Sequence, residues 1–80
     1  MSKKIKLIWD FKGQVATKTA QHHEVHLKEF ILLNKVESIK TGFEIINEFH
    51  AIAFMVVNED KMLSVRDLLK PHRGEIYSKF

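Results

Sequence analysis

The sequence of 80 residues predicts an α+β fold with the element order βαββαβ. Two observations predict it. Apolar and polar residues alternate in short runs, as in strands with one buried face, and in two other stretches apolar residues recur at intervals of three and four, as in helices. This order is that of the ferredoxin-like plait, a four-stranded antiparallel sheet with two helices on one face. No repeat or linker interrupts it, so we expect residues 1–80 to form a single domain.

The first strand and the first helix account for the N-terminal half. Residues 3–11 alternate, with Ile5, Leu7, Trp9 and Phe11 on one face of the predicted strand. Gly13 ends this pattern. From Gln14 to about Asn34 the spacing becomes helical and predicts about five turns, whose inward positions are Ala16, Ala20, Leu27, Phe30 and Ile31.

Two further strands follow. Thr41 and Gly42 are expected to open a strand over residues 43–49, and residues 51–57 form the next one. The latter run is apolar on both faces, which predicts a central strand covered from both sides. Because two helices cover only one face of the sheet, we expect a second copy of the chain to cover the other face. The interface would contain Ala53, Met55 and Val57, or the residues that alternate with them.

A short helix and a last strand complete the chain. The side chains of Asn58, Glu59 and Asp60 supply capping oxygens for a helix that runs through Lys70. Pro71 ends the helix, and residues 72–77 form the last strand.

The composition excludes several classes of function. Absence of cysteine removes disulfides, thiolate metal sites and cysteine nucleophiles, and favours a reducing, cytoplasmic location. No apolar run is long enough for a membrane segment. The net charge of +3 is mild, and the predicted central strand lacks the glycine and the exposed aromatic pair with which plaits of this kind stack RNA bases. We therefore expect neither a nucleic-acid nor a membrane partner.

Three segments give the chain a resemblance to a known family. They are Ile8-Trp9-Asp10-Phe11 before the first helix, Glu48-Phe49-His50 before the central strand, and Val57-Asn58-Glu59-Asp60 before the second helix. The chain resembles small members of the dimeric α/β-barrel superfamily, which includes stress-responsive barrel proteins and cofactor-free monooxygenases. The resemblance implies a homodimer with its two sheets face to face and a pocket between each sheet and its helices. It carries over no complete catalytic set.

Polar residues cluster where three predicted strands meet at one edge of the sheet. The end of the first strand and the starts of the third and fourth bring together Asp10, Glu48, His50, His72 and Arg73, beside Trp9. This mixture suits a small polar or anionic aromatic ligand and offers acid–base groups. The alternative is that these side chains only satisfy backbone groups at the strand ends. Residues 70–74 have the same two interpretations, as an anion-binding turn or as basic groups that complement a helix C-terminus.

The three histidines of the first helix have different expected roles. His23 lies on the inward face, where it either lines a cavity or is a core histidine with a hydrogen-bond partner. His22 and His26 are four residues apart on the outer face, and Glu29 continues their stripe. This spacing can chelate zinc, but it is not the metalloprotease motif and structural zinc needs four ligands. We expect no stoichiometric metal.

These observations favour a small-molecule-binding protein or a cofactor-free enzyme of the dimeric barrel type. Its pocket would be lined by Trp9, Asp10, His23, His50, His72 and Arg73, with the three histidines as the catalytic candidates. The alternative is a structural or regulatory homodimeric interaction module in which the histidines have no chemical role.

Overall fold

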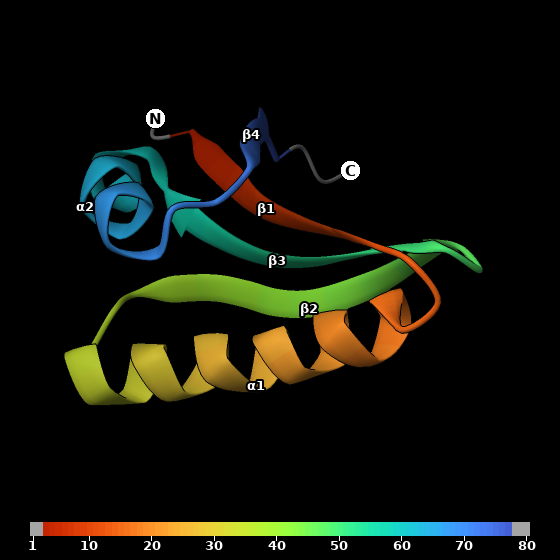
Figure 1. The fold of residues 1–80 in the computed structure, drawn as a ribbon. Coiled ribbons are helices and arrows are strands. Elements are labelled where there is room, and N and C mark those ends of the chain that lie inside the picture. The colour runs from red at the N-terminus through yellow and green to blue at the C-terminus, as the bar shows by residue number, and fades with distance from the viewer. Residues whose placement is uncertain (1–2, 78–80) are drawn as a thin grey trace.

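A computed structural model describes residues 3–77 and confirms the predicted α+β fold. The chain forms four strands and two helices in the order expected (Figure 1). The strands and helices are β1 (Lys4–Lys12), α1 (Ala16–Asn34), β2 (Ser38–Asn47), β3 (His50–Asn58), α2 (Glu59–Leu69) and β4 (Arg73–Ile76).

The sheet has the strand order β2-β3-β1-β4, and every neighbouring pair is antiparallel. Both helices pack on the same face, because Leu27 of α1 and Val65 of α2 belong to one buried cluster with Leu7, Trp9, Ala53, Met55 and Val57 of the two central strands. Figure 1 shows α1 running along β2, whereas α2 lies apart from it near the start of β1. Ala16 and Ala20 bring the start of α1 close to Ala51 of β3.

The face of β3 opposite the helices is buried within the single chain, so the apolar character of both faces gives no reason to expect a second copy. Ala53, Met55 and Val57 face the helices, and their alternates Ile52, Phe54 and Val56 are also buried in the single chain. The Lys6 ammonium lies 4.5 Å from the centre of the Phe54 ring, and the opposite residue of β2 is Gly42. A side chain at Gly42 would place its Cβ 2.7 Å from Phe54 Cζ, so glycine gives the ring room to lie across β2.

β2 begins at Ser38, five residues earlier than predicted. Gly42 is a mid-strand residue beneath an aromatic ring and not a strand opener. Two register irregularities interrupt β2, between residues 38 and 40 and between residues 45 and 47. At the other helix, Asn58 occupies the N-cap position of α2 but makes no side-chain capping bond, so the predicted cap is wrong there. The acidic Glu59 and Asp60 still complement the helix dipole.

Candidate functional site

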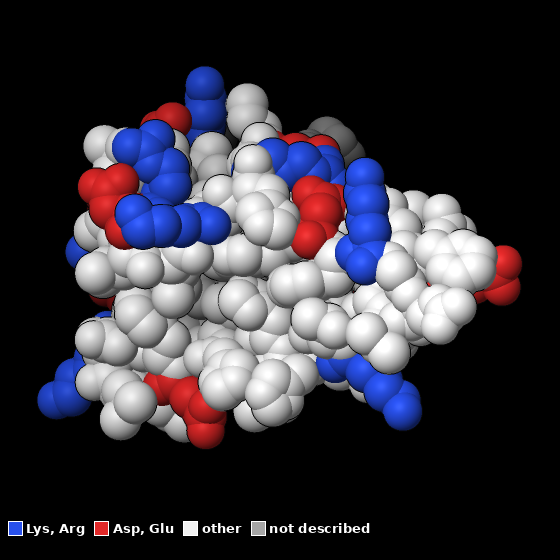
Figure 2. Space-filling view, in the orientation of Figure 1, with Lys and Arg blue, Asp and Glu red and all other residues white. Residues whose placement is uncertain are grey.

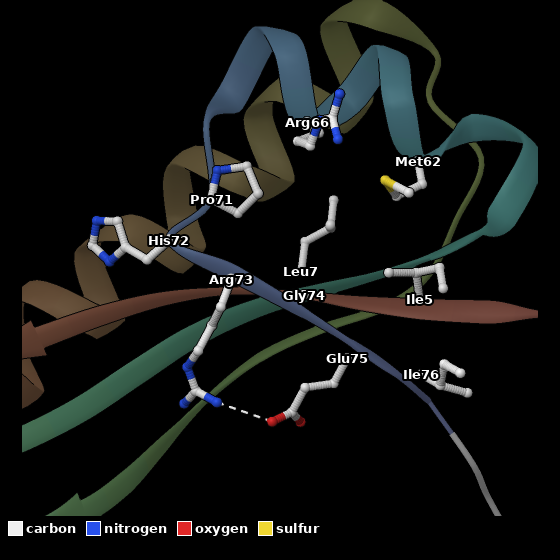
Figure 3. Close-up of a pocket in the computed structure, with 10 residues that line it drawn as sticks. All are labelled: Ile5, Leu7, Met62, Arg66, Pro71, His72, Arg73, Gly74, Glu75 and Ile76. Atoms are coloured by element: carbon white, nitrogen blue, oxygen red, sulfur yellow. Dashed lines mark hydrogen bonds and ion pairs between the residues drawn. The ribbon is translucent and has the colours of Figure 1, made fainter.

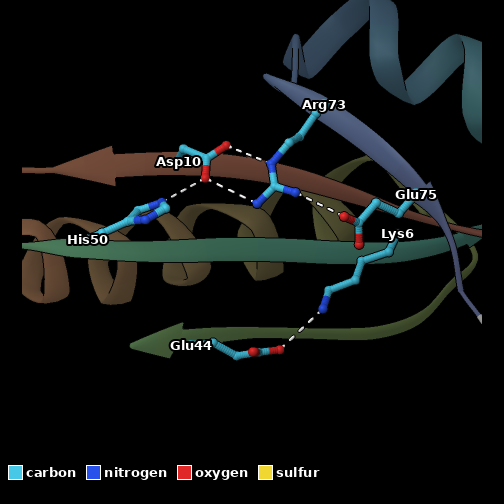
Figure 4. A network of polar contacts seen from close by, with 6 residues as sticks. All are labelled: Lys6, Asp10, Glu44, His50, Arg73 and Glu75. Carbon is cyan, nitrogen blue, oxygen red and sulfur yellow. Dashed lines mark hydrogen bonds and ion pairs between the residues drawn. The ribbon is translucent and has the colours of Figure 1, made fainter. Parts of the chain in front are cut away.

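The strand ends bring Asp10, His50 and Arg73 together as the sequence predicted, on the sheet face opposite the helices (Figure 4). The register explains this meeting. Arg73 is paired with Ile8, and His50 is paired with Lys12, so Asp10 lies between them on β1. Arg73 Nε donates to Asp10 Oδ2 at 2.9 Å and Nη2 to Oδ1 at 3.3 Å, and His50 Nε2 lies 2.8 Å from Oδ1.

These contacts determine the charge of the cluster. The pKa of Asp10 is lowered from 3.8 to about 2, mainly by the hydrogen bond from Arg73. Burial opposes this effect, and the contacts with Arg73 and His50 together outweigh it. The same carboxylate raises the pKa of Arg73. Asp10 is therefore ionised at neutral pH and both its oxygens are engaged. Asp10 can therefore orient His50, but it is not placed to accept a proton from a substrate.

The cluster continues as a row of charged side chains across the sheet (Figure 4). Arg73 Nη1 donates to Glu75 Oε2 at 2.9 Å, and Lys6 Nζ lies 3.2 Å from Glu44 Oε1. Beneath the row lie the buried apolar residues Ile8, Ile52, Phe54 and Val56. The row also has an explanation without a ligand, as the polar cover of apolar residues on an open sheet face.

Trp9, His23 and His72 lie on the helix side of the sheet, so the sheet divides the single pocket that we predicted. The His23 ring is 5.0 Å from Trp9 and 5.4 Å from Phe11, measured between ring centres. Trp9 Nε1 donates to the carbonyl of Leu69 at 3.1 Å. The division follows from the alternation of a strand, since Trp9 and Asp10 are neighbours in sequence and point to opposite faces. Glu48 lies exposed in the turn after β2 and does not join the cluster in any contact that the structure shows.

Within residues 3–77, His23 is not the core histidine with a hydrogen-bond partner that was one of its two expected roles. Its Nε2 atom is buried and has no hydrogen-bond partner within the described part of the chain. Burial lowers the pKa of His23, and the nearby histidines 26, 72 and 22 add to this effect. The ring therefore stays neutral at physiological pH.

His72 is fixed by a backbone hydrogen bond. The amide N–H of Asp10 donates to His72 Nδ1 at 2.8 Å. Because Nδ1 is the acceptor, the neutral ring carries its proton on Nε2. His72 thus offers an N–H donor on the helix side of the sheet, where its ring lies 6.4 Å from that of Phe11.

A cleft lies between α2 and β4, on the helix side of the sheet where a pocket was expected (Figure 3). Of the six residues predicted to line the pocket, His72 and Arg73 line this cleft. Its volume is about 380 Å³, within the range of small-molecule sites. Two cations, Arg66 and Arg73, stand among the lining residues. The full lining comprises Ile5, Leu7, Met62, Arg66, Pro71, His72, Arg73, Gly74, Glu75 and Ile76.

The predicted anion-binding turn supplies part of the lining of this cleft. Pro71, His72, Arg73 and Gly74 were singled out, and all four line it. Met62 and Leu7 could not be singled out in this way, because apolar residues at inward positions are expected in any core. The guanidinium of Arg73 is already engaged by Asp10 and Glu75, whereas among the described residues that of Arg66 has only a 3.5 Å contact with the neighbouring Asp67. Arg66 is therefore the cation more available to a ligand.

Figure 2 shows a broad region without charged side chains between α2 and α1, with Lys, Arg, Asp and Glu above it, below it and to its right. On α1, Leu32 and Leu33 are 78% and 83% exposed.

Within residues 3–77, no group of three or more His, Asp or Glu side chains is placed to hold a metal ion. Neither helix of the described chain is long and apolar enough to cross a membrane.

The structure thus defines a small plait with a polar cluster on one sheet face and a cleft on the other. Comparisons with protein-family models, with curated proteins and with solved structures find no match to this chain.

Proposed function

We propose that the chain binds a small anionic ligand with an apolar body in the cleft between α2 and β4. The observation that carries the proposal is a cleft of about 380 Å³ whose apolar lining includes Leu7, Met62 and Ile76 and whose available cation is Arg66. An apolar lining with few polar groups is typical of small-molecule sites. The ligand class agrees with the polar or anionic aromatic ligand expected from the sequence, but most of the binding residues are different.

A cofactor-free reaction in this cleft would use His72. Of the three histidines proposed as catalytic, His72 lines the cleft, whereas His50 is on the other sheet face and His23 lies against Trp9 and Phe11. Because Nδ1 accepts from the Asp10 amide, the neutral ring offers Nε2–H as a hydrogen-bond donor, so His72 would polarise a substrate oxygen and would not transfer a proton.

The proposal includes a homodimer of the dimeric α/β-barrel type in the cytoplasm. The βαββαβ topology and the absence of cysteine support these two points. The alternative function, a homodimeric interaction module without catalysis, has its own support in the exposed Leu32 and Leu33, since neighbouring apolar side chains at a surface favour protein contact.

Binding of anilinonaphthalene sulfonate, a fluorescent aromatic anion, tests the cleft directly. A Cβ at Gly74 would lie 3.7 Å from side-chain atoms of Ile5 and Leu7, an ordinary contact, so we expect Gly74→Val to narrow the cleft, and circular dichroism verifies that the variant is folded. We expect saturable binding to the wild type, at least tenfold weaker binding to Gly74→Val, and weaker binding to Arg66→Gln. Lys61→Gln, an exposed cation on the same helix, is the matched control and should bind as the wild type does. Equal affinity of Gly74→Val and the wild type would exclude the cleft as the site.

A further inference from the structure

The outward face of α1 carries three side chains in a chain of polar contacts. His22 Nε2 and His26 Nε2 are 2.9 Å apart, and the two rings meet nearly edge to face with an interplanar angle of 79°. On the far side of the second ring, Glu29 Oε1 lies 3.3 Å from His26 Nδ1. All three side chains are exposed, so water and dissolved ions reach them freely.

The position of Glu29 favours one of the two tautomers of His26. A carboxylate 3.3 Å from Nδ1 favours the neutral ring that carries its proton on that nitrogen. The lone pair is then on Nε2, directed toward His22. Metal-binding histidines commonly donate their other N–H to a carboxylate in this way. Glu29 therefore orients the imidazole and is not itself a ligand, which revises the role suggested by its spacing.

The separation of the two nitrogens favours a particular class of ion. An ion about 2.0–2.1 Å from each nitrogen, the usual distance for imidazole, sees the two atoms at an angle of roughly 90°. Tetrahedral coordination, which zinc prefers, needs a nitrogen–nitrogen distance of about 3.3 Å. An angle near 90° suits the tetragonal and square-planar geometries of Cu²⁺ and Ni²⁺.

We propose that His22 and His26 form a two-imidazole chelate for Cu²⁺ or Ni²⁺, with Glu29 as the positioning residue and water in the remaining positions. The ion takes the place of the proton between the two Nε2 atoms. With only two protein ligands the site binds its ion from solution and releases it on dialysis. This agrees with the expectation that the purified protein carries no stoichiometric metal.

Calorimetric titration with Cu²⁺ or Ni²⁺ tests the chelate, and the nitrogen hyperfine pattern of bound Cu²⁺ counts its imidazoles. The matched control exchanges two neighbours, Gln21→His with His22→Gln. It keeps five histidines but places the pair five residues apart, about 140° around the helix. We expect one ion per wild-type chain with two coordinated nitrogens, and at least tenfold weaker binding to the exchange variant and to His26→Ala. Glu29→Gln should weaken binding by up to about tenfold.

Three results would overturn the proposal. They are equal affinity of the exchange variant and the wild type, a hyperfine pattern of one nitrogen, and tighter binding of Zn²⁺ than of Ni²⁺. Circular dichroism of each variant verifies that the helix is intact, and His22→Ala should leave the free energy of unfolding nearly unchanged because the pair is exposed. A thermal shift on adding Ni²⁺ to the wild type, absent in the exchange variant, supports the chelate independently, since its geometry exists only in the folded helix.

Discussion

Replacing Asp10 by asparagine should remove a pH-dependent part of the stability of this chain. Asp10 is 20% exposed, and its pKa is lowered from 3.8 to about 2, mainly by Arg73. If fully expressed, that difference corresponds to about 2.4 kcal/mol of folding free energy. Arg73 is 45% exposed, however, so solvent screens the pair, and we expect about 1 kcal/mol.

The sign follows from the direction of the change in pKa. The folded chain holds the Asp10 proton less tightly than the unfolded chain does, so the contribution is complete above the unfolded pKa near 3.8 and is lost as the pH falls through about 2. Urea unfolding of the wild type and of Asp10→Asn should therefore differ by about 1 kcal/mol at pH 6, and the difference should close near pH 2.

The same titration on Asp67→Asn provides the control. Asp67 is 71% exposed, and its contact with Arg66 is 3.5 Å long, so this substitution should change the free energy of unfolding by less than about 0.5 kcal/mol at any pH. Parallel stability curves of the wild type and Asp10→Asn from pH 6 to pH 2 would refute the reasoning. They would mean that the cluster around Asp10 contributes no net charge-dependent stability.

Three more predictions concern packing, burial and assembly. Gly42→Ala should destabilise the fold by about 1–3 kcal/mol in urea unfolding because its Cβ meets the Phe54 ring, and an unchanged midpoint would contradict that contact. His23→Leu removes a buried nitrogen without a partner in the described chain and a ring with a lowered pKa. The stability of the wild type should therefore fall relative to that of this variant as the pH drops below 6.5, and a constant difference from pH 8 to pH 5 would disprove it. Sedimentation at micromolar concentration should show a dimer, and a clean monomer would exclude the proposed homodimer.

The order of the elements could be predicted because the two periodicities are strong and the breaks between them are clear. Gly13 and Pro71 lie at or near the ends of elements, as expected. Gly42 was misinterpreted because a glycine in an isolated sequence looks the same whether it ends a strand or accommodates an aromatic ring. The difference depends on Phe54, twelve residues away, and so on the pairing of β2 with β3.

The sequence predicted which residues meet at the candidate site better than it predicted on which face of the sheet each side chain lies. Topology alone brings Asp10, His50 and Arg73 together, because their strands meet at one edge. The division of the pocket follows from alternation alone, because Trp9 and Asp10 are consecutive in β1 and so point to opposite faces. The cleft could not be found in this way, since it depends on how far α2 stands from β4.

The two register irregularities of β2 have a consequence for the behaviour of the protein at high concentration. β2 is an edge strand, and its outer backbone groups are a template on which another extended chain could add. The irregularities leave a regular ladder only over residues 40–45 and bend the strand at both ends. Because Ile45 and Ile46 are exposed beside the second irregularity, this local distortion limits edge-to-edge aggregation where the strand is most apolar.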